Sequence, residues 1–359
     1  MGAYLGMGFA GSGIGMEEQS LLLLSGAVPV SPQVDTAGWN ALRRYVLTLA
    51  PEKVPVDEAR PARYETLELL QARSLSELGS ERAVVTGLNW DERAGNFRVG
   101  TYNGQTLTWP EAMPSPLPKL TFPVSQQVRY GDMHYVLEVG VFIPNETEYG
   151  VLHRYGPDGS HDTLATGLRR TVDLQVADLN GDEQPEFIIC EYGNLQGRLT
   201  LLINGEKRTL LDVPGTIRTQ VRDLNKDGRP DIIVLAAQGN EGVFALYQQA
   251  NGSFQQRQLI RLPPIYGTSW FELLDYDGDG DQDVVLVNGD NADYSHFLKP
   301  YHGLRLYLND GQNNFTKVAF VPLYGATRVV AHDFDEDGDY DFSVTAFFAD
   351  REREPAASF

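Results

Sequence analysis

Four short acidic segments share one spacing of oxygen-bearing side chains, and we call them the first to fourth acidic loops. In each loop such side chains occupy positions 1, 3, 5 and 9, and the loops begin 45, 52 and 58 residues apart. Calcium takes several hard oxygen ligands, so a turn with this spacing can direct all four side chains at one ion. The candidate calcium ligands are Asp178, Asn180, Asp182 and Glu186 in the first loop, Asp223, Asn225, Asp227 and Asp231 in the second, Asp275, Asp277, Asp279 and Asp283 in the third, and Asp333, Asp335, Asp337 and Asp341 in the fourth.

The four loops meet this requirement to different degrees. A glycine at position 6 permits positive φ where the chain wraps around an ion, and Gly228, Gly280 and Gly338 supply it. The third and fourth loops carry four aspartates each, so we expect the strongest sites there. Asn225 removes one carboxylate from the second loop, which predicts weaker charge compensation. Glu183 stands where the first loop needs glycine, so that loop is expected to be distorted or empty.

The sequence context of the loops indicates structural ions between strands. An EF-hand would need flanking helices and a glutamate at position 12, where the third and fourth loops have Leu286 and Val344. Runs such as Ile232–Leu235 and Val284–Val287 follow the loops and are typical of buried strands. A catalytic ion keeps an open position beside an acid or base. Similar sites in successive repeats instead favour metal ions with a structural role. We therefore predict structural calcium and no enzymatic activity.

The spacing of the loops predicts the fold. Periods of about 40 to 50 residues fit four-stranded propeller blades, and longer periods imply loop insertions. Residues 82–109 and 128–168 have hairpin turns without the acidic pattern, and a further repeat opens at residue 326. The prediction is an all-β protein, a β-propeller of about six to seven four-stranded blades over residues 61–359, with the last blade incomplete at the C-terminus.

Residues 1–60 are expected to be a separate helical region and linker. Apolar residues at helical spacing predict one amphipathic helix over 35–50, and Pro51 would end it. The residues on its apolar face are Trp39, Leu42, Val46 and Leu49. The prolines that follow favour a linker, which sets the predicted domain boundary near residue 60.

Composition excludes several classes of function. With 49 acidic and 29 basic residues, the net charge of −20 disfavours binding to nucleic acid or to anionic lipids. Cys190 is the only cysteine, so a disulfide framework and a thiolate zinc site are excluded, and no C-x-x-C-H is present to hold haem. The longest aliphatic run, Leu21–Leu24, is too short to span a bilayer. The histidines show no short metal-binding spacing; they are His134, His153, His161, His296, His302 and His332.

The repeats resemble the FG-GAP/VCBS repeat family, whose members include integrin-like propellers and secreted bacterial proteins. Four segments are similar to a bacterial subgroup in which such a propeller follows a c-type cytochrome domain: Val221–Gly228, Leu262–Gly267, Val287–Tyr294 and Lys299–Gly303. This resemblance implies that residues 1–60 are the remnant of a cytochrome c-like region. Haem is expected only if a longer native chain supplies the C-x-x-C-H motif.

A polar insertion in the third acidic repeat is the candidate surface for a ligand or partner, and its residues are Asp290, Asn291, Asp293, Lys299 and His302. The expected function is a calcium-binding propeller that acts as an interaction module or scaffold for a protein or a glycan. Two alternatives remain: an accessory subunit of a membrane-associated electron-transfer complex, and a carbohydrate-active enzyme. Because millimolar calcium occurs outside the cytoplasm, we expect a periplasmic or extracellular location even though no signal peptide is recognisable.

Overall fold

The structure is a computed structural model that describes residues 19–20, 22–23, 28–29, 31–49, 84–109, 117–290 and 299–347. The predicted domain boundary near residue 60 lies outside these residues. Helix α2 (Thr36–Leu49) confirms the predicted helix. It begins after Asp35, whose Oδ1 accepts the Gly38 N–H at 2.6 Å and caps the first turn. Within the described residues, no helix combines the length and hydrophobicity that a bilayer span requires.

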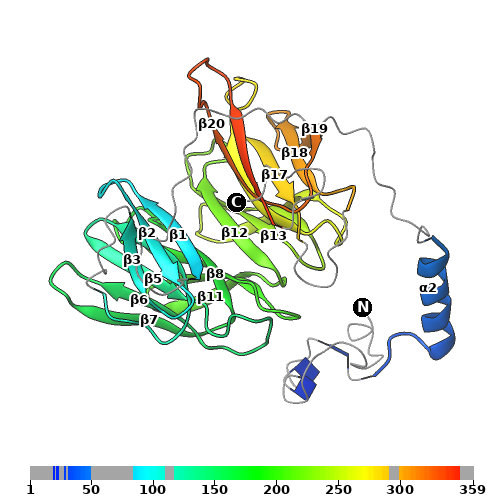
Figure 1. Ribbon diagram of the computed structural model, residues 1–359, viewed down its shortest axis with the longest axis horizontal. Helices are drawn as coiled ribbons and strands as arrows, with labels where there is room; N and C mark the ends of the chain where they lie inside the picture. The colour runs from blue at the N-terminus through cyan, green and yellow to red at the C-terminus, as the bar shows by residue number, and fades with distance from the viewer. Residues whose placement is uncertain are drawn as a thin grey trace.

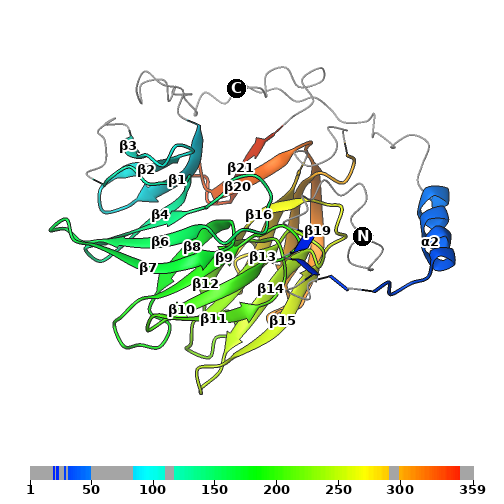
Figure 2. The ribbon, with the colours of Figure 1, turned by 90° about the horizontal axis from the view of Figure 1, so that it is seen from below.

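The rest of the described chain forms antiparallel sheets whose strands follow one another in sequence (Figures 1 and 2). The first sheet contains β1 (Val85–Asp91), β2 (Asn96–Thr101) and β3 (Thr106–Trp109); the second, β4 (Val124–Tyr130), β5 (Met133–Glu138), β6 (Gly150–Tyr155) and β7 (His161–Leu168). The third contains β8 (Thr171–Ala177), β9 (Glu186–Glu191), β10 (Arg198–Ile203) and β11 (Glu206–Leu211); the fourth, β12 (Thr216–Arg222), β13 (Asp231–Ala236), β14 (Gly242–Gln248) and β15 (Phe254–Arg261). The fifth contains β16 (Thr268–Leu274), β17 (Asp283–Asn288), β18 (Gly303–Asn309) and β19 (Phe315–Pro322), and β20 (Ala326–His332) pairs with β21 (Asp341–Ala346).

These sheets are arranged as an all-β propeller. The first strands of successive sheets contact one another in the order β1, β4, β8, β12, β16 and β20, so they form the inner ring of the propeller. The described residues form five blades of three or four strands, followed by the β20–β21 hairpin. The predicted number of six to seven blades is therefore wrong for this structure. The predicted number includes the repeat that opens at residue 326, but the described part of that repeat contributes only two strands, β20 and β21.

In the third, fourth and fifth blades, the second strand is the most buried element. Every residue of β9, β13 and β17 is buried, because these strands pack against the neighbouring sheets on both faces. The outer strands β15 and β19 are largely exposed. This gradient explains why apolar runs directly follow the acidic loops in the sequence. The hydrophobic core is consequently divided into clusters between successive sheets.

Hydrogen bonds and an ion pair connect the inner strands of neighbouring blades. The buried Asp173 of β8 accepts hydrogen bonds from the Thr219 N–H at 2.8 Å and the Thr219 hydroxyl at 3.0 Å. One blade further, Arg218 donates to the Phe271 carbonyl at 2.9 Å and to both carboxylate oxygens of Glu272 at 3.0 and 3.1 Å. Since an unpaired buried carboxylate would be costly, these bonds fix how adjacent blades meet.

Truncating a fully buried inner-strand residue should destabilise the propeller. Phe271 lies in the cluster between the fourth and fifth sheets, and Phe271→Ala should cost about 3–5 kcal/mol through lost burial and a residual cavity. Urea denaturation followed by circular dichroism would show a lower midpoint. The exposed Val318 of β19 is the control, since Val318→Ala should leave the midpoint nearly unchanged. Equal midpoints for the two variants would contradict this account of the core.

Candidate metal centre

Each acidic loop joins the first strand of a sheet to its buried second strand. The loops connect β8 to β9, β12 to β13, β16 to β17 and β20 to β21. The residue at position 9 is also the first residue of the second strand, namely Glu186, Asp231, Asp283 and Asp341. All four loops therefore lie at the same end of the inner strands.

One hydrogen-bond pattern recurs in all four loops. The position 9 carboxylate accepts the backbone N–H of position 2, from Leu179 at 2.7 Å, Leu224 at 3.1 Å, Tyr276 at 2.9 Å and Phe334 at 3.0 Å. The position 1 aspartate accepts the N–H of position 6, from Glu183 at 2.9 Å, Gly228 at 2.8 Å, Gly280 at 3.0 Å and Gly338 at 2.9 Å. The repeat in sequence is therefore also a repeat in local geometry.

The backbone turns in the same way in every loop. Position 6 has positive φ throughout, at 64° for Glu183, 85° for Gly228, 85° for Gly280 and 99° for Gly338. The first loop was expected to be distorted because Glu183 replaces glycine, but its backbone keeps the common turn. The backbone of Glu183 instead adopts the left-handed conformation, at a cost of about 1–2 kcal/mol.

The third and fourth loops each bring three carboxylates together. Oxygens of Asp275, Asp277 and Asp283 lie within 4.8 Å of one another, and the same holds for the fourth-loop residues Asp333, Asp335 and Asp341. Asp275 Oδ1 is buried and has no hydrogen-bond partner among the described residues. A hard cation would supply the missing contact, so the donor set of these two loops fits calcium. The position 5 residues Asp279 and Asp337 are not members of these clusters.

The first two loops satisfy their oxygens internally. In the second loop Asp227 forms an ion pair with Arg229 and accepts a hydrogen bond from the Asn225 amide at 2.9 Å. In the first loop the Asn180 amide donates to Glu186 Oε1 at 2.9 Å. Side-chain donors thus hydrogen-bond to carboxylate oxygens that would otherwise be free to bind a cation. Among the described residues, neither loop forms a three-carboxylate group like those of the third and fourth loops.

Crowding of the acidic side chains raises the pKa of several of them. Burial raises the pKa of Asp283, and repulsion from Asp277 and Asp279 raises it further. Burial likewise raises the pKa of Asp231 and of Glu186. The ionised loops are therefore strained by desolvation and repulsion, and a bound cation would relieve both.

An ion pair links the second loop to the third. Lys226 Nζ lies 2.5 Å from Asp281 Oδ1, and this bond raises the pKa of Lys226. The contact places a positive charge beside the most complete carboxylate cluster. It also joins acidic loops of neighbouring blades.

The structure alters the candidate partner surface at the polar insertion. Lys299 Nζ donates to the Asp290 carbonyl at 3.0 Å, which closes the base of the insertion. His302 is 0% exposed, its Nδ1 accepts the Gly325 N–H at 3.4 Å, and burial lowers its pKa to about 4. This neutral, enclosed imidazole is not part of an exposed surface, which corrects the prediction for His302. Asn291 and Asp293 lie outside the described residues.

The sequence reasoning missed a histidine chain on the second blade. Glu138 Oε2 lies 2.9 Å from His153 Nε2, and His153 Nδ1 lies 3.0 Å from His161 Nε2. The ring of Tyr155 stacks on His161 with centroids 4.6 Å apart. These residues come from β5, β6 and β7, and antiparallel pairing brings them to one face. Their spacing along the chain gives no short motif, so only the strand register could have revealed them.

Comparison with known proteins identifies the repeat. Residues 223–286, which contain the second and third acidic loops, match the FG-GAP-like repeat. This match covers part of the chain, and the propeller arrangement of the sheets agrees with such a repeat. A search of curated proteins found no significant match.

Solved structures with similar coordinates include three proteins of different kinds. A luciferin-regenerating enzyme has a TM-score of 0.47 and 14% identity, covering 76% of this chain and 86% of that chain. A putative gluconolactonase has a TM-score of 0.44 and 12% identity, and the match covers 75% of this chain and 88% of the gluconolactonase. A chain of the mitotic checkpoint complex has a TM-score of 0.48 and 10% identity, and the match covers 75% of this chain and 73% of that chain. Similarities this distant assign no function.

The fourth loop should be more stable without one of its charges when calcium is absent. Desolvation and then repulsion from Asp337 raise the pKa of Asp335. Its carboxyl group therefore contributes stability below its unfolded pKa, and this contribution is lost as the pH rises through the folded-state value. In chelator, Asp335→Asn should raise the melting temperature at about pH 7. The difference should vanish below the ordinary pKa of 3.8.

Asp310 provides a control of opposite sign. Hydrogen bonds from the Asn314 side chain and the Gln312 N–H lower the pKa of Asp310. Its stabilising contribution is present above the unfolded pKa and is lost as the pH falls through the folded-state value. Asp310→Asn should therefore lower the melting temperature at neutral pH. The same direction of change for Asp335→Asn and Asp310→Asn would refute the repulsion argument.

Proposed function

We propose that this chain, whose residues 223–286 match the FG-GAP-like repeat, is a calcium-binding β-propeller that acts as an extracytoplasmic interaction module. Its partner would be a protein or a glycan, and its location the periplasm or the extracellular space. The finer relationship to cytochrome-fused bacterial propellers is part of the same proposal. The calcium ions would have a structural role and hold the blades in the arrangement that presents their surfaces.

The third acidic loop carries this proposal. Three carboxylates converge there on one point, and Asp275 Oδ1 is buried without a partner among the described residues. The donor set consists of oxygen atoms alone, which favours calcium over the transition metals that prefer imidazole or thiolate. The flexible, glycine-containing turn also suits calcium better than magnesium, which demands stricter octahedral geometry.

The repetition of the loop supports a structural role for the ions. The same pattern of hydrogen bonds occurs at four successive sheets, whereas a reaction centre needs one unique arrangement. A site with Kd of ~0.1 mM in ~1 mM calcium contributes about 1.4 kcal/mol to folding. Stabilisation of this size requires extracellular calcium concentrations, which supports the proposed location.

Calcium should stabilise the protein, and chelation should reverse the effect. Melting temperature measured by circular dichroism should rise as calcium is titrated into chelated protein, and calorimetry should detect binding to the third and fourth loops first. Asp277→Asn removes one carboxylate of the third cluster and should reduce the number of bound ions by one. Asp310→Asn, which lies outside every acidic loop, should leave the calcium response intact. Absence of both a melting shift and binding heat would exclude the calcium assignment.

A further inference from the structure

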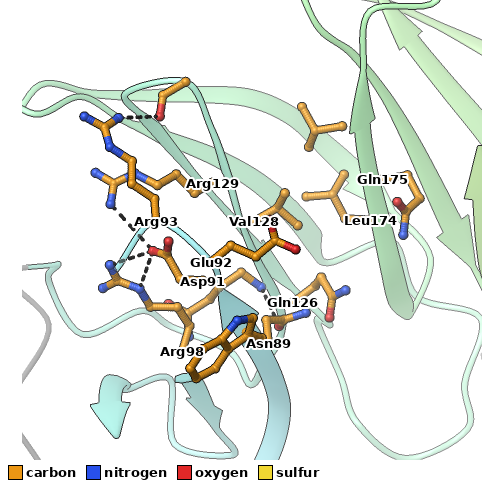
Figure 3. Close-up of a pocket in the computed structure, with 14 residues that line it drawn as sticks. Asn89, Asp91, Glu92, Arg93, Arg98, Gln126, Val128, Arg129, Leu174 and Gln175 are labelled. Atoms are coloured by element: carbon orange, nitrogen blue, oxygen red, sulfur yellow. Dashed lines mark hydrogen bonds and ion pairs between the residues drawn. The ribbon is translucent and has the colours of Figure 1, made fainter. Parts of the chain in front are cut away.

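A polar pocket of about 600 Å³ lies where the first three sheets meet (Figure 3). Its walls come from the inner strands β1, β4 and β8, which contact one another in that order. The lining on β8 ends at Val176, just before the first acidic loop, so the pocket contains none of the candidate calcium ligands. None of the predicted site residues lines it.

The charges around the pocket balance one another. The buried Asp91 accepts hydrogen bonds from Arg98 Nε at 3.1 Å and Nη2 at 2.9 Å, and Arg129 Nη1 lies 3.5 Å from it. Arg93 pairs with Asp132 at 2.6 Å. Figure 3 shows these guanidinium groups on one side of the pocket. Arg98 and Arg129 share Asp91, and Glu92 also lines the pocket, so the three arginines are balanced by Asp91, Glu92 and Asp132 and leave no excess positive charge for an anionic ligand.

Amide side chains from all three strands supply the remaining polar groups. They are Asn89 of β1, Gln126 and Gln127 of β4, and Gln175 of β8. Each amide offers both hydrogen-bond donors and acceptors, which matches a ligand hydroxyl that both donates and accepts. Asn89 is held in place, since its Oδ1 accepts the Gln127 N–H at 3.2 Å.

Gln127 has the most unusual environment in the pocket. Its side chain is 3% exposed, and neither its Oε1 nor its Nε2 has a hydrogen-bond partner among the described residues. Leaving such groups unpaired costs about 1–3 kcal/mol each. Both atoms are enclosed by protein, so they lie behind the pocket surface, and a ligand in the pocket would meet the other amides instead.

Trp90 adds an apolar surface beside the amides. Its side chain is 53% exposed, and its ring packs edge-on against Phe97 with centroids 4.9 Å apart. An exposed indole next to hydrogen-bonding amides suits a ligand that has both C–H faces and hydroxyl edges. Neutral sugars have these two features in every ring.

We propose that this pocket binds a neutral saccharide, with Trp90 against the apolar face of the ring and the amides of Asn89, Gln126 and Gln175 on its hydroxyl groups. The proposal rests on the proposed function as an interaction module and names a glycan as the partner. A charged peptide or a phosphate group would leave the balanced arginine–carboxylate pairs with no role in recognition. The arginines instead hold the pocket wall in shape.

Binding can be tested with the full chain in calcium buffer. Glucose, galactose, mannose, N-acetylglucosamine and their β-linked disaccharides would each be titrated, with calorimetry and tryptophan fluorescence as readouts. At least one of these neutral sugars should bind. Trp90→Ala and Gln175→Ala should each weaken that binding at least about tenfold.

Two matched controls distinguish the pocket from the rest of the surface. Tyr149 is 55% exposed and precedes β6, and Gln256 is an exposed amide of β15. Tyr149→Ala and Gln256→Ala should leave sugar affinity unchanged. Equal loss of affinity in the controls, or full affinity in Trp90→Ala and Gln175→Ala, would place binding elsewhere and overturn the proposal.

Charged probes and calcium complete the test. Binding of galacturonate, inorganic phosphate or an acidic peptide in place of neutral sugars would overturn the assignment of ligand class. Failure of every neutral sugar to bind would overturn the pocket assignment. If the melting temperature still rises with calcium in that case, the calcium-binding proposal stands and only the saccharide site fails.

Discussion

The most consequential interaction in this propeller is the one made by the carboxylate that begins each buried second strand. Glu186, Asp231 and Asp283 are buried, and each also accepts the backbone N–H of position 2 of its own loop. This bond closes the acidic loop onto the strand that packs against both neighbouring sheets. A charge is thereby held at the edge of the hydrophobic core, where it needs further compensation. The loop chemistry and the blade packing consequently depend on each other.

The blades compensate such charges in different ways. In the third and fourth loops three carboxylates converge, with Lys226 of the second loop paired to Asp281 beside the third cluster, and calcium would balance the remaining charge. In the second loop Arg229 takes one carboxylate, and on the first sheet Arg98 and Arg129 surround Asp91 at the end of β1. The guanidinium groups thus neutralise a carboxylate at the end of β1, as a bound metal ion would neutralise the carboxylates of the acidic loops. The inner strands of the early blades are then available to form a pocket.

Repeated and single arrangements accordingly occupy different parts of the chain. The blades with acidic loops repeat one loop and one packing scheme, which suits a structural role. The amide pocket with Trp90 lies between β1, β4 and β8, and the hydrogen-bonded chain of Glu138, His153 and His161 lies in the second sheet. Unique arrangements are where selective binding can arise, because repetition alone cannot distinguish one partner from another.

The sequence by itself determined the local features. The alternation of carboxylates determined the turn of the acidic loops, which is the same with glycine or with Glu183 at position 6. The β-branched runs determined the strands after the loops, because both features depend on residues within one short segment. The number of blades, the burial of His302, the contact of His153 with His161 and the pocket between β1, β4 and β8 required the tertiary structure. These contacts join strands whose register and neighbours depend on packing across the whole sheet, and no local spacing encodes that.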